Sequence, residues 1–453
     1  MAEVDILIIG AGTAGEYAAG TAKMYTDSVG LVEKGPVGGD CIFHACIPTK
    51  AMVHAARAYS KAKSNDFFGL PNLDKTADYK KVKAFKDGIV SGIGTGRAER
   101  WTGQGIQLFQ GDARFISATE VQVGDEVITA GSIIIVTGSE PSVPPIPGLK
   151  ESGAITNVEA LELEEAPGRL AVIGGGPIGV EFARIFSAFG SAVHIYEAAD
   201  RILINEDDDV SLAVTESFVN QGIEVSTSVG VSAVESTASG KVITAKAADG
   251  KESKAEYDQI LVATGRKPAI DSLNLAAAGI ESTRRGITVD ASLRTNVPNI
   301  WAAGDVTGTF LFTFVASEQG KTAVMNAIGG QNIELNYDVL PRATFCDPEV
   351  ASVGLTEKQA LEQGFKVKTG RFDNANLTMG IVSGNTEGFI KIVAEEGSGR
   401  ILGGHIVGAE ASSLIHEVAA AMAGKVSAAD IGKTLHAYPT MSEGVRYACQ
   451  AIG

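Results

Sequence analysis

Short runs of hydrophobic residues that end in glycines recur along this chain of 453 residues. Residues 4–9 (VDILII) lead straight into a glycine-rich stretch at residues 10–15, and residues 170–173 (LAVI) lead in the same way into residues 174–179. A short apolar run bounded by glycine is typical of a buried strand, and the glycines favour a tight turn out of that strand. The pattern therefore predicts the same strand–turn–helix unit twice.

Each copy of this repeat also has an acidic residue at the same distance from its first glycine. Glu33 follows Gly10 by 23 positions, and Glu197 follows Gly174 by 23 positions. In such a unit the glycines allow a tight turn, a close approach to a pyrophosphate and close helix packing, while the acid binds a ribose. The repeat therefore predicts two dinucleotide-binding domains. Their glycines are Gly10, Gly12 and Gly15 in the first copy, and Gly174, Gly176 and Gly179 in the second.

Cys41 and Cys46 lie shortly after the first repeat, just behind a glycine pair and just ahead of Lys50. Two thiols so close in the chain can alternate between a disulfide and a dithiol. The alternative is an ordinary buried pair or a metal-binding pair, but zinc needs four ligands at short spacings, and the remaining cysteines, Cys346 and Cys449, stand alone. In an ideal helix the two Cα atoms would lie about 8.7 Å apart, whereas a disulfide tolerates about 7 Å. We therefore expect Cys41 in a distorted first helical turn.

The run of residues 41–50, C-x4-C-x-P-T-K, closely resembles the redox-active disulfide of the pyridine nucleotide-disulfide oxidoreductases. That family includes dihydrolipoamide dehydrogenase, glutathione reductase and mercuric reductase. The resemblance covers essentially the full length, because residues 300–305 resemble the second flavin motif and residues from about 337 resemble the dimerisation domain. It implies an α/β fold with two Rossmann-like domains and a C-terminal α+β dimerisation domain. The implied segments are 1–145 (FAD-binding, first part), 146–266 (NAD-binding), 267–336 (FAD-binding or central, second part) and 337–453 (dimerisation).

The resemblance also implies roles for individual residues. Cys41 is the interchange thiol, Cys46 is the charge-transfer thiol next to the flavin, and Lys50 lies beside the flavin ring and pairs with Glu181. Glycine at position 179 and the carboxylate of Glu197 favour NAD over NADP, although Arg201 argues the other way. The implied FAD-binding residues are Gly10, Gly12, Gly15, Glu33, Lys34, Gly39, Lys50, Ala113, Thr137, Gly138, Ser139, Gly304 and Asp305. The implied NAD-binding residues are Gly174, Gly176, Gly179, Glu197 and Gly265.

The C-terminal run of residues 436–443 departs from the family pattern H-x-H-P-T-x-S-E. There the second histidine is the base that handles the substrate thiol, paired with the glutamate that corresponds to Glu443; here that position is Tyr438, while His436 matches the upstream histidine. A phenol has a pKa of about 10 and an imidazole one of about 6.5, so tyrosine is a poor base at neutral pH. Mercuric reductases also carry tyrosine here, but they use an additional C-terminal cysteine pair, and this chain has Cys449 alone.

His44 lies between the redox cysteines, and the sequence allows two interpretations of it: it tunes the thiols, or it faces solvent on the distorted turn.

Composition narrows the choice of binding partners. A net charge of −16 argues against nucleic acid and anionic membranes. Four cysteines do not form a disulfide framework, so we expect a reducing compartment. The chain enters a strand at once, and no apolar run approaches the roughly 18 residues of a membrane helix. The sequence therefore predicts a cytoplasmic protein without a resident metal site.

These observations lead to one functional hypothesis and two rivals. The hypothesis is a homodimeric, FAD-dependent enzyme of the dihydrolipoamide dehydrogenase type, which moves two electrons between NAD(H) and a dithiol, disulfide or protein-bound lipoyl substrate through Cys41 and Cys46. The first rival is a mercuric-reductase-like enzyme or another reductase of metal ions or small disulfides. The second is a slow-turnover flavoprotein that acts as a redox sensor or assembly subunit.

Overall fold

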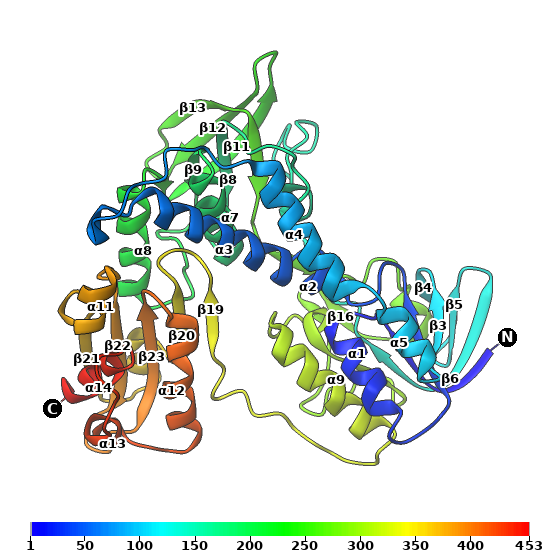
Figure 1. Ribbon diagram of the computed structural model, residues 1–453. Coiled ribbons are helices and arrows are strands. Elements are labelled where there is room, and N and C mark those ends of the chain that lie inside the picture. Colours follow the sequence, from blue (N-terminus) through cyan, green and yellow to red (C-terminus); the bar gives the residue numbers. More distant parts are fainter. Residues whose placement is uncertain (1, 453) are drawn as a thin grey trace. The chain divides into compact units, whose positions relative to one another are not determined.

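The computed structural model describes residues 2–452, which fall into two compact units (Figure 1). The first unit comprises residues 2–51, 84–142 and 265–336, and the second comprises residues 52–83, 143–264 and 337–452. The helices α3 (Cys46–Lys63) and α4 (Tyr79–Gly94) each begin in one unit and end in the other. The finer boundaries that the sequence predicts at residues 145, 266 and 336 remain a prediction.

The first unit is built on a mixed sheet in which β1 follows the first predicted hydrophobic run. Parallel pairing joins β1 to β2 and β6, β2 to β3, and β6 to β18, while β4 and β5 extend the sheet beyond β6 in antiparallel fashion. The order along the sheet is β3-β2-β1-β6-β5-β4. The strands are β1 (Ala2–Ile9), β2 (Val29–Glu33), β3 (Gln107–Gln110), β4 (Ala113–Phe115), β5 (Glu120–Val123), β6 (Glu126–Ile135) and β18 (Ile300–Ala302).

Alternating side chains of β1 enter two separate cores, which is why the strand is apolar along most of its length. Ile6 and Ile8 pack with the helices on one face, whereas Leu7 and Ile9 pack on the other face. On the helical face α1 (Thr13–Ala22) and α9 (Thr313–Ala327) lie side by side (Figure 1). Their approach is close because Gly320 has no side chain: a Cβ there would lie 2.3 Å from the carbonyl oxygen of Ala14.

Shorter elements complete the first unit and bring its later segments back to the sheet. The hairpin-like pair β7 and β15 is antiparallel and joins residues from before and after the intervening second unit. These elements are α2 (Gly39–Phe43), α5 (Arg97–Gly103), β7 (Ser139–Pro141), β15 (Arg266–Pro268), η2 (Leu275–Ala278), β16 (Ser282–Thr283), β17 (Gly286–Ile287) and η3 (Gly304–Thr307).

The second unit contains the second strand–turn–helix copy and a C-terminal antiparallel sheet. The parallel strands run in the order β10-β9-β8-β14, next to the meander β11-β12-β13. The strands are β8 (Arg169–Ile173), β9 (Ala192–Tyr196), β10 (Glu224–Ser226), β11 (Val229–Ser236), β12 (Lys241–Ala247), β13 (Glu252–Tyr257) and β14 (Gln259–Val262), and the helices are η1 (Asp66–Phe68), α6 (Asn157–Ala160), α7 (Pro177–Ala188) and α8 (Asp208–Asn220).

The C-terminal sheet has the order β19-β20-β23-β22-β21 with antiparallel neighbours. Its strands are β19 (Arg342–Thr344), β20 (Val350–Gly354), β21 (Val367–Asp373), β22 (Phe389–Glu395) and β23 (Ile401–Val407). The helices of this region are α10 (Glu357–Glu362), η4 (Asn374–Asn376), α11 (Thr378–Ser383), α12 (Ala411–Ala423), α13 (Ala428–Lys433) and α14 (Glu443–Gln450). The predicted α/β fold with an α+β C-terminal part is thus confirmed.

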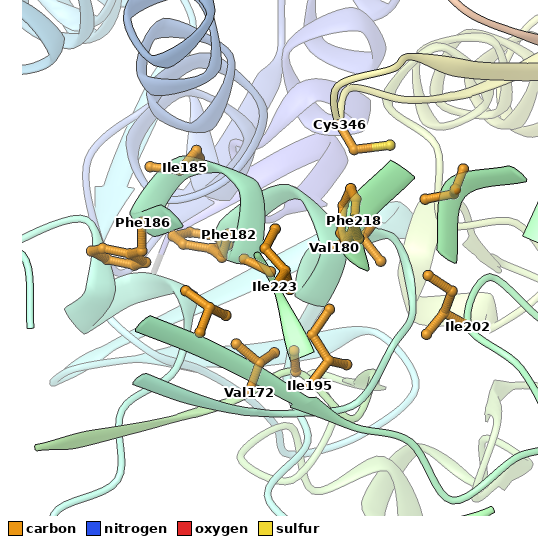
Figure 2. Packing of buried hydrophobic residues seen from close by; sticks show 14 of the residues in the cluster. Val172, Val180, Phe182, Ile185, Phe186, Ile195, Ile202, Phe218, Ile223 and Cys346 are labelled. Carbon is orange, nitrogen blue, oxygen red and sulfur yellow. The ribbon is translucent and has the colours of Figure 1, made fainter. Parts of the chain in front are cut away.

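The core of the second unit continues from the nucleotide-binding part into the C-terminal part. Figure 2 shows Phe182 and Phe186 of α7 packed over Val172 and Ile195 of the sheet, with Cys346 in the same cluster. Cys346 is therefore a core residue. None of the helices within residues 2–452 is long and apolar enough to cross a membrane.

Candidate active site

In the first glycine turn, side chains at Gly10 and Gly15 would clash with the backbone. Gly10 has a φ of +109°, and a Cβ there would lie 2.5 Å from the carbonyl oxygen of Val136. A Cβ on Gly15 would lie 1.9 Å from the carbonyl oxygen of Gly10. Gly12 caps the start of α1, and the nearest atom to its hypothetical Cβ is 3.9 Å away, so the helix N-terminus stays accessible. Open N–H groups at a helix start suit a phosphate.

Glu33 lies directly against this turn. Its carboxylate accepts a hydrogen bond of 2.7 Å from the backbone N–H of Ala11 and another of 2.7 Å from that of Gly35. Beside it is a cavity of about 180 Å³ whose lining includes several of the residues that the sequence assigned to FAD. These are Gly10, Glu33, Lys34, Ala113 and Thr137. A fixed carboxylate, an open helix start and an adjacent cavity fit the ribose, phosphate and base of a dinucleotide.

The second copy repeats this geometry in the second unit. Gly174 has a φ of +108°, and a Cβ on Gly179 would lie 2.0 Å from the carbonyl oxygen of Gly174. Gly176 caps the start of α7 without a close neighbour. Glu197 accepts hydrogen bonds of 2.7 Å from the backbone N–H groups of Gly175 and Ala199, as Glu33 does in the first copy. The two acids therefore hold their turns by the same pair of bonds.

Arg201 follows Glu197 closely in the chain, but carboxylates hold its guanidinium. Its Nη2 lies 2.8 Å from Oδ1 of Asp208, and its Nη1 lies 3.3 Å from Oδ1 of Asp200. Nη2 also donates to the carbonyl oxygen of Ile204 at 3.3 Å. An arginine neutralised in this way is a weaker ligand for a 2′-phosphate than one that points into open space.

The two cysteines lie on different helices. Cys41 is in α2, Cys46 begins α3, and His44 between them leaves the helical conformation with a φ of −136°. The sequence predicted a distortion at the first turn of one helix; in the structure the break falls after Cys41, at His44. A continuous helix would hold the Cα atoms of the two cysteines farther apart than a disulfide tolerates. Both side chains are thiols here.

Thr313 brings the two sulfurs together from a distant part of the chain. Its hydroxyl oxygen lies 3.4 Å from Sγ of Cys41 and 3.4 Å from Sγ of Cys46. The hydrogen bond with Cys46 and burial both raise the pKa of Cys41, while Thr313 and the charge of Lys50 act in the opposite direction. Cys41 therefore keeps its proton at neutral pH, and the pair does not lose two protons together. Thr313 was not among the site residues predicted from the sequence.

A chain of polar contacts leads from this turn to Asp305. Arg266 donates to Oδ2 of Asp40 at 2.6 Å and to the hydroxyl of Ser139 at 2.7 Å, and that hydroxyl donates to Oδ2 of Asp305 at 2.7 Å. Burial would raise the pKa of Asp40, but His44 and Arg266 together hold it below its usual range. Burial raises the pKa of Asp305 in spite of Ser139 and Arg266. Asp40 and Arg266 were not identified from the sequence as site residues.

The remaining residues assigned to FAD shape the backbone around the same turn. Gly39 has a φ of +66°, and a Cβ there would lie 2.6 Å from Cα of Gly12, so the redox turn and the phosphate turn lie back to back. Thr137 donates its hydroxyl to the carbonyl oxygen of Ala269 at 2.8 Å, and Gly138 accepts the N–H of Ala269 at 3.0 Å. Gly304 has a φ of +77°.

Three further predicted residues have partners of their own. Glu181 is a buried residue of α7, and its Oε1 accepts the backbone N–H of Phe345 at 2.8 Å. Lys50 lies on α3 one turn beyond Cys46, and its pairing with Glu181 stays a prediction. Gly265, assigned to NAD, belongs to the first unit, has a φ of +109° and accepts the N–H of Ser142 at 2.9 Å.

The C-terminal segment holds its own polar groups. His436 contacts Glu417 through Nε2 at 2.8 Å and the carbonyl oxygen of Thr434 through Nδ1 at 3.0 Å. Tyr438 is 71% exposed, and its hydroxyl lies 3.4 Å from that of Thr378.

Glu443 is 3% exposed, and both of its carboxylate oxygens bond within its own segment. One accepts the N–H of Thr440 at 3.2 Å, and the other accepts the hydroxyl of Tyr447 at 3.1 Å. Among the described residues, no group of three or more histidine, cysteine, aspartate or glutamate side chains is placed to hold a metal ion.

Comparison with known sequence families gives two matches that together span almost the whole chain. Residues 4–327 match the family described as pyridine nucleotide-disulphide oxidoreductase, and residues 340–449 match the family described as its dimerisation domain. Among curated proteins, a dihydrolipoyl dehydrogenase of Chlamydia pneumoniae is 38% identical over 446 residues, which cover 97% of this chain and 95% of that protein. A mercuric reductase of Bacillus cereus is 36% identical over 451 residues, 98% of this chain and 71% of that protein.

Solved structures point the same way. The HOCl-induced flavoprotein disulfide reductase RclA from Escherichia coli superimposes with a TM-score of 0.88 at 28% sequence identity, with 99% of this chain and 100% of that chain covered. A Cu(II) complex of the same protein matches with a TM-score of 0.88 at 29% identity, covering 97% and 98% of the two chains. This chain therefore belongs to the pyridine nucleotide-disulphide oxidoreductase family, as the sequence predicted.

Proposed function

We propose that this member of the family is an FAD-dependent enzyme that transfers two electrons between NAD(H) and a dithiol or disulfide substrate, most nearly of the dihydrolipoamide dehydrogenase type. One observation carries the proposal. The sulfurs of Cys41 and Cys46 both lie 3.4 Å from the hydroxyl of Thr313, in the unit whose glycine turn and cavity fit a dinucleotide. Full-length identity to dihydrolipoyl dehydrogenases supports the same choice.

The residues of the first unit fit FAD, which when bound supplies a two-electron acceptor and donor between the nicotinamide and the thiol pair. Glu33 holds the turn over which the adenosine ribose would bind, and the open start of α1 would receive the phosphates. Asp305, oriented by Ser139, would bind the ribityl chain. Lys50, four residues beyond Cys46 on α3, would supply positive charge beside the flavin.

The thiols then have separate tasks. Cys41 would be the interchange thiol that exchanges with the substrate, and it must give up its proton to become a nucleophile. Cys46 begins α3, where the helix start would favour its thiolate. The electron pair passes between the chain and the substrate as one sulfur–sulfur bond forms and another breaks.

We further propose NAD as the coenzyme and a homodimer as the working state. Glu197 would accept a ribose hydroxyl and repel a 2′-phosphate, and Arg201 is neutralised by Asp208. Residues 340–449 match the dimerisation domain of the family, which supports a shared site between two copies. The sparse cysteines support a reducing, cytoplasmic location.

The principal rival is reduction of metal ions, because mercuric reductases are about as similar as dihydrolipoyl dehydrogenases and RclA has been solved with Cu(II). An anaerobic titration of the holoenzyme with NADH, followed by a screen of acceptors, separates the possibilities. NADH oxidation that depends on lipoamide supports the proposal, and oxidation that depends on Hg(II) or Cu(II) replaces it. Complete flavin reduction without turnover on any acceptor indicates a redox sensor or subunit.

A further inference from the structure

Thiol exchange at Cys41 needs an acid–base group, and position 438, where the resemblance places that group, does not carry a histidine in this chain. Position 438 carries a phenol in place of an imidazole, and its hydroxyl contacts Thr378. His436 uses one ring nitrogen on Glu417 and the other on a backbone carbonyl. Glu443, the expected partner of a base at position 438, bonds to Tyr447. The segment therefore has no imidazole–carboxylate pair at position 438.

An imidazole–carboxylate pair does exist next to Cys41. His44 follows Cys41 by three residues, and its N–H donates to the carbonyl oxygen of Asp40 at 2.8 Å, which closes a helical turn. Its Nδ1 lies 3.4 Å from Oδ1 of Asp40. His44 is thus the residue that ends the helical turn carrying Cys41. The His44 side chain is 41% exposed, which gives a substrate access to it.

The carboxylate of this pair is fixed in turn. Oδ2 of Asp40 accepts the 2.6 Å bond from Arg266, whose side chain is only 12% exposed and is itself held by Ser139. An activated nucleophile generally has a base beside it, and a third group orients that base. In this pair the imidazole is the base and the carboxylate orients it. Other charged or titratable groups near the turn are Cys46 and Lys50 on α3 and Asp305 on η3, and neutral Thr313 approaches from α9.

We propose that His44, positioned by Asp40, is the acid–base residue for thiol–disulfide exchange at Cys41. This proposal depends on one part of the proposed function, the role of Cys41 as the interchange thiol. With a dithiol substrate, His44 accepts the proton of one substrate thiol, and the resulting thiolate attacks Sγ of Cys41. A substrate–Cys41 bond forms, the Cys41–Cys46 bond breaks, and Cys46 leaves as the thiolate.

His44 then returns its proton to solvent and takes that of the second substrate thiol, which attacks the substrate sulfur bound to Cys41. The substrate disulfide forms, the bond to Cys41 breaks, and the proton on His44 goes to Cys41. The substrate is oxidised by two electrons and the enzyme disulfide is reduced by the same two. In the opposite direction His44 takes the proton of Cys41, whose high pKa otherwise keeps it a poor nucleophile.

The test uses dithiothreitol, so that it does not depend on the physiological substrate. The oxidised full-length protein is mixed with dithiothreitol under anaerobic conditions from pH 6 to 10, quenched in acid and alkylated, and the remaining disulfide is counted by intact mass. His44→Gln should slow disulfide reduction at pH 7 by roughly 10²-fold, the lower end for a positioned base. The deficit should shrink toward pH 10, where dithiothreitol supplies its own thiolate. His54→Gln, which removes an exposed imidazole elsewhere on α3, is the matched control and should match the wild type.

Asp40→Asn tests the positioning role. Loss of the carboxylate should lower the rate of disulfide reduction at pH 7, and it should have no further effect in the His44→Gln background, because Asp40 acts through the imidazole. A merely structural role for Asp40 would lower the rate by the same factor in both backgrounds. The inference is overturned if the His44→Gln and wild-type profiles superimpose, or if the loss is the same at every pH. Failure of NADH to reduce the holoenzyme, or of lipoamide to accept electrons, would refute the proposed function and leave this test intact.

Discussion

The prediction that follows most directly from the second unit is a preference for NADH over NADPH. Glu197 places a charged carboxylate on the turn where the adenosine ribose would bind, and both of its oxygens are fixed by backbone N–H groups at 2.7 Å. A 2′-phosphate about 5 Å away would be repelled by about 0.8 kcal/mol per unit charge in water, and by about 3 kcal/mol at an effective dielectric of 20. Glu197 is partly exposed, which places the repulsion between these limits.

We therefore expect the kcat/KM for NADH to exceed that for NADPH by at least tenfold, equivalent to about 1.4 kcal/mol. Glu197→Gln keeps the size and one acceptor oxygen but removes the charge, so the ratio should fall toward unity. Asp208→Asn removes the carboxylate 2.8 Å from Arg201 and should improve NADPH use, most clearly in combination with Glu197→Gln. Glu216→Gln on α8 removes an exposed charge of the same sign and should leave the ratio unchanged.

The assay is steady-state oxidation of each coenzyme with one common acceptor, at two ionic strengths. Salt screens an electrostatic preference, so the wild-type ratio should narrow at higher ionic strength, whereas the ratio of Glu197→Gln should not. Equal use of the two coenzymes by the wild type would refute the reasoning. So would an unchanged ratio in Glu197→Gln, because the preference would then come from the shape of the turn and not from its charge.

Cys46→Ser should abolish the long-wavelength absorption of the two-electron-reduced holoenzyme, and Cys41→Ser should retain it; a band that survives Cys46→Ser contradicts the assignment of the thiols. Tyr438→His should raise the rate of lipoamide exchange at neutral pH by less than the roughly 10²-fold of a positioned base, and Tyr447→Phe should increase the gain by releasing the nearby carboxylate. No gain in the double variant would show that an imidazole at position 438 does not reach the exchanging thiol. The free energy of unfolding should fall below about pH 6.5, by at most about 1.4 kcal/mol per pH unit for each histidine, because burial lowers the pKa of His405 and of His194 and the unfolded chain binds the extra protons. In chemical denaturation His405→Gln should reduce that slope, and an unchanged slope would assign it to other groups.

The fold was predictable because its key signals are local. Gly10 and Gly174 adopt φ values of +109° and +108°, which other residues avoid. A glycine at the end of an apolar run therefore indicates the turn from the sequence alone. The alternation of Ile6 and Ile8 with Leu7 and Ile9 reflects a strand buried on both faces, which a continuous apolar run already indicates. The family resemblance extended these local signals to the whole chain, and the comparisons confirm it.

The surroundings of the thiols were not predictable, because they come from segments far apart in the chain. Thr313 reaches Cys46 across 267 positions, and Arg266 reaches Asp40 across 226. Neither side chain belongs to a local pattern that spacing reveals. The helix break between the two cysteines could also be predicted only to within a few residues. The limit on the Cα–Cα distance of a disulfide requires a break, but it does not determine which residue ends the helix.

Glu443 occupies the glutamate position of the family motif, but its carboxylate is bonded to a different residue. The sequence placed this carboxylate five residues after Tyr438, ready for an imidazole, but Tyr447 follows Glu443 by four residues on α14 and takes one of its oxygens. Residues four apart on a helix face one another, so this contact is local and hard to displace. Restoring histidine at position 438 therefore supplies a ring without a free carboxylate. His44 already has a carboxylate fixed by Arg266, and the proton transfer at Cys41 falls to that pair.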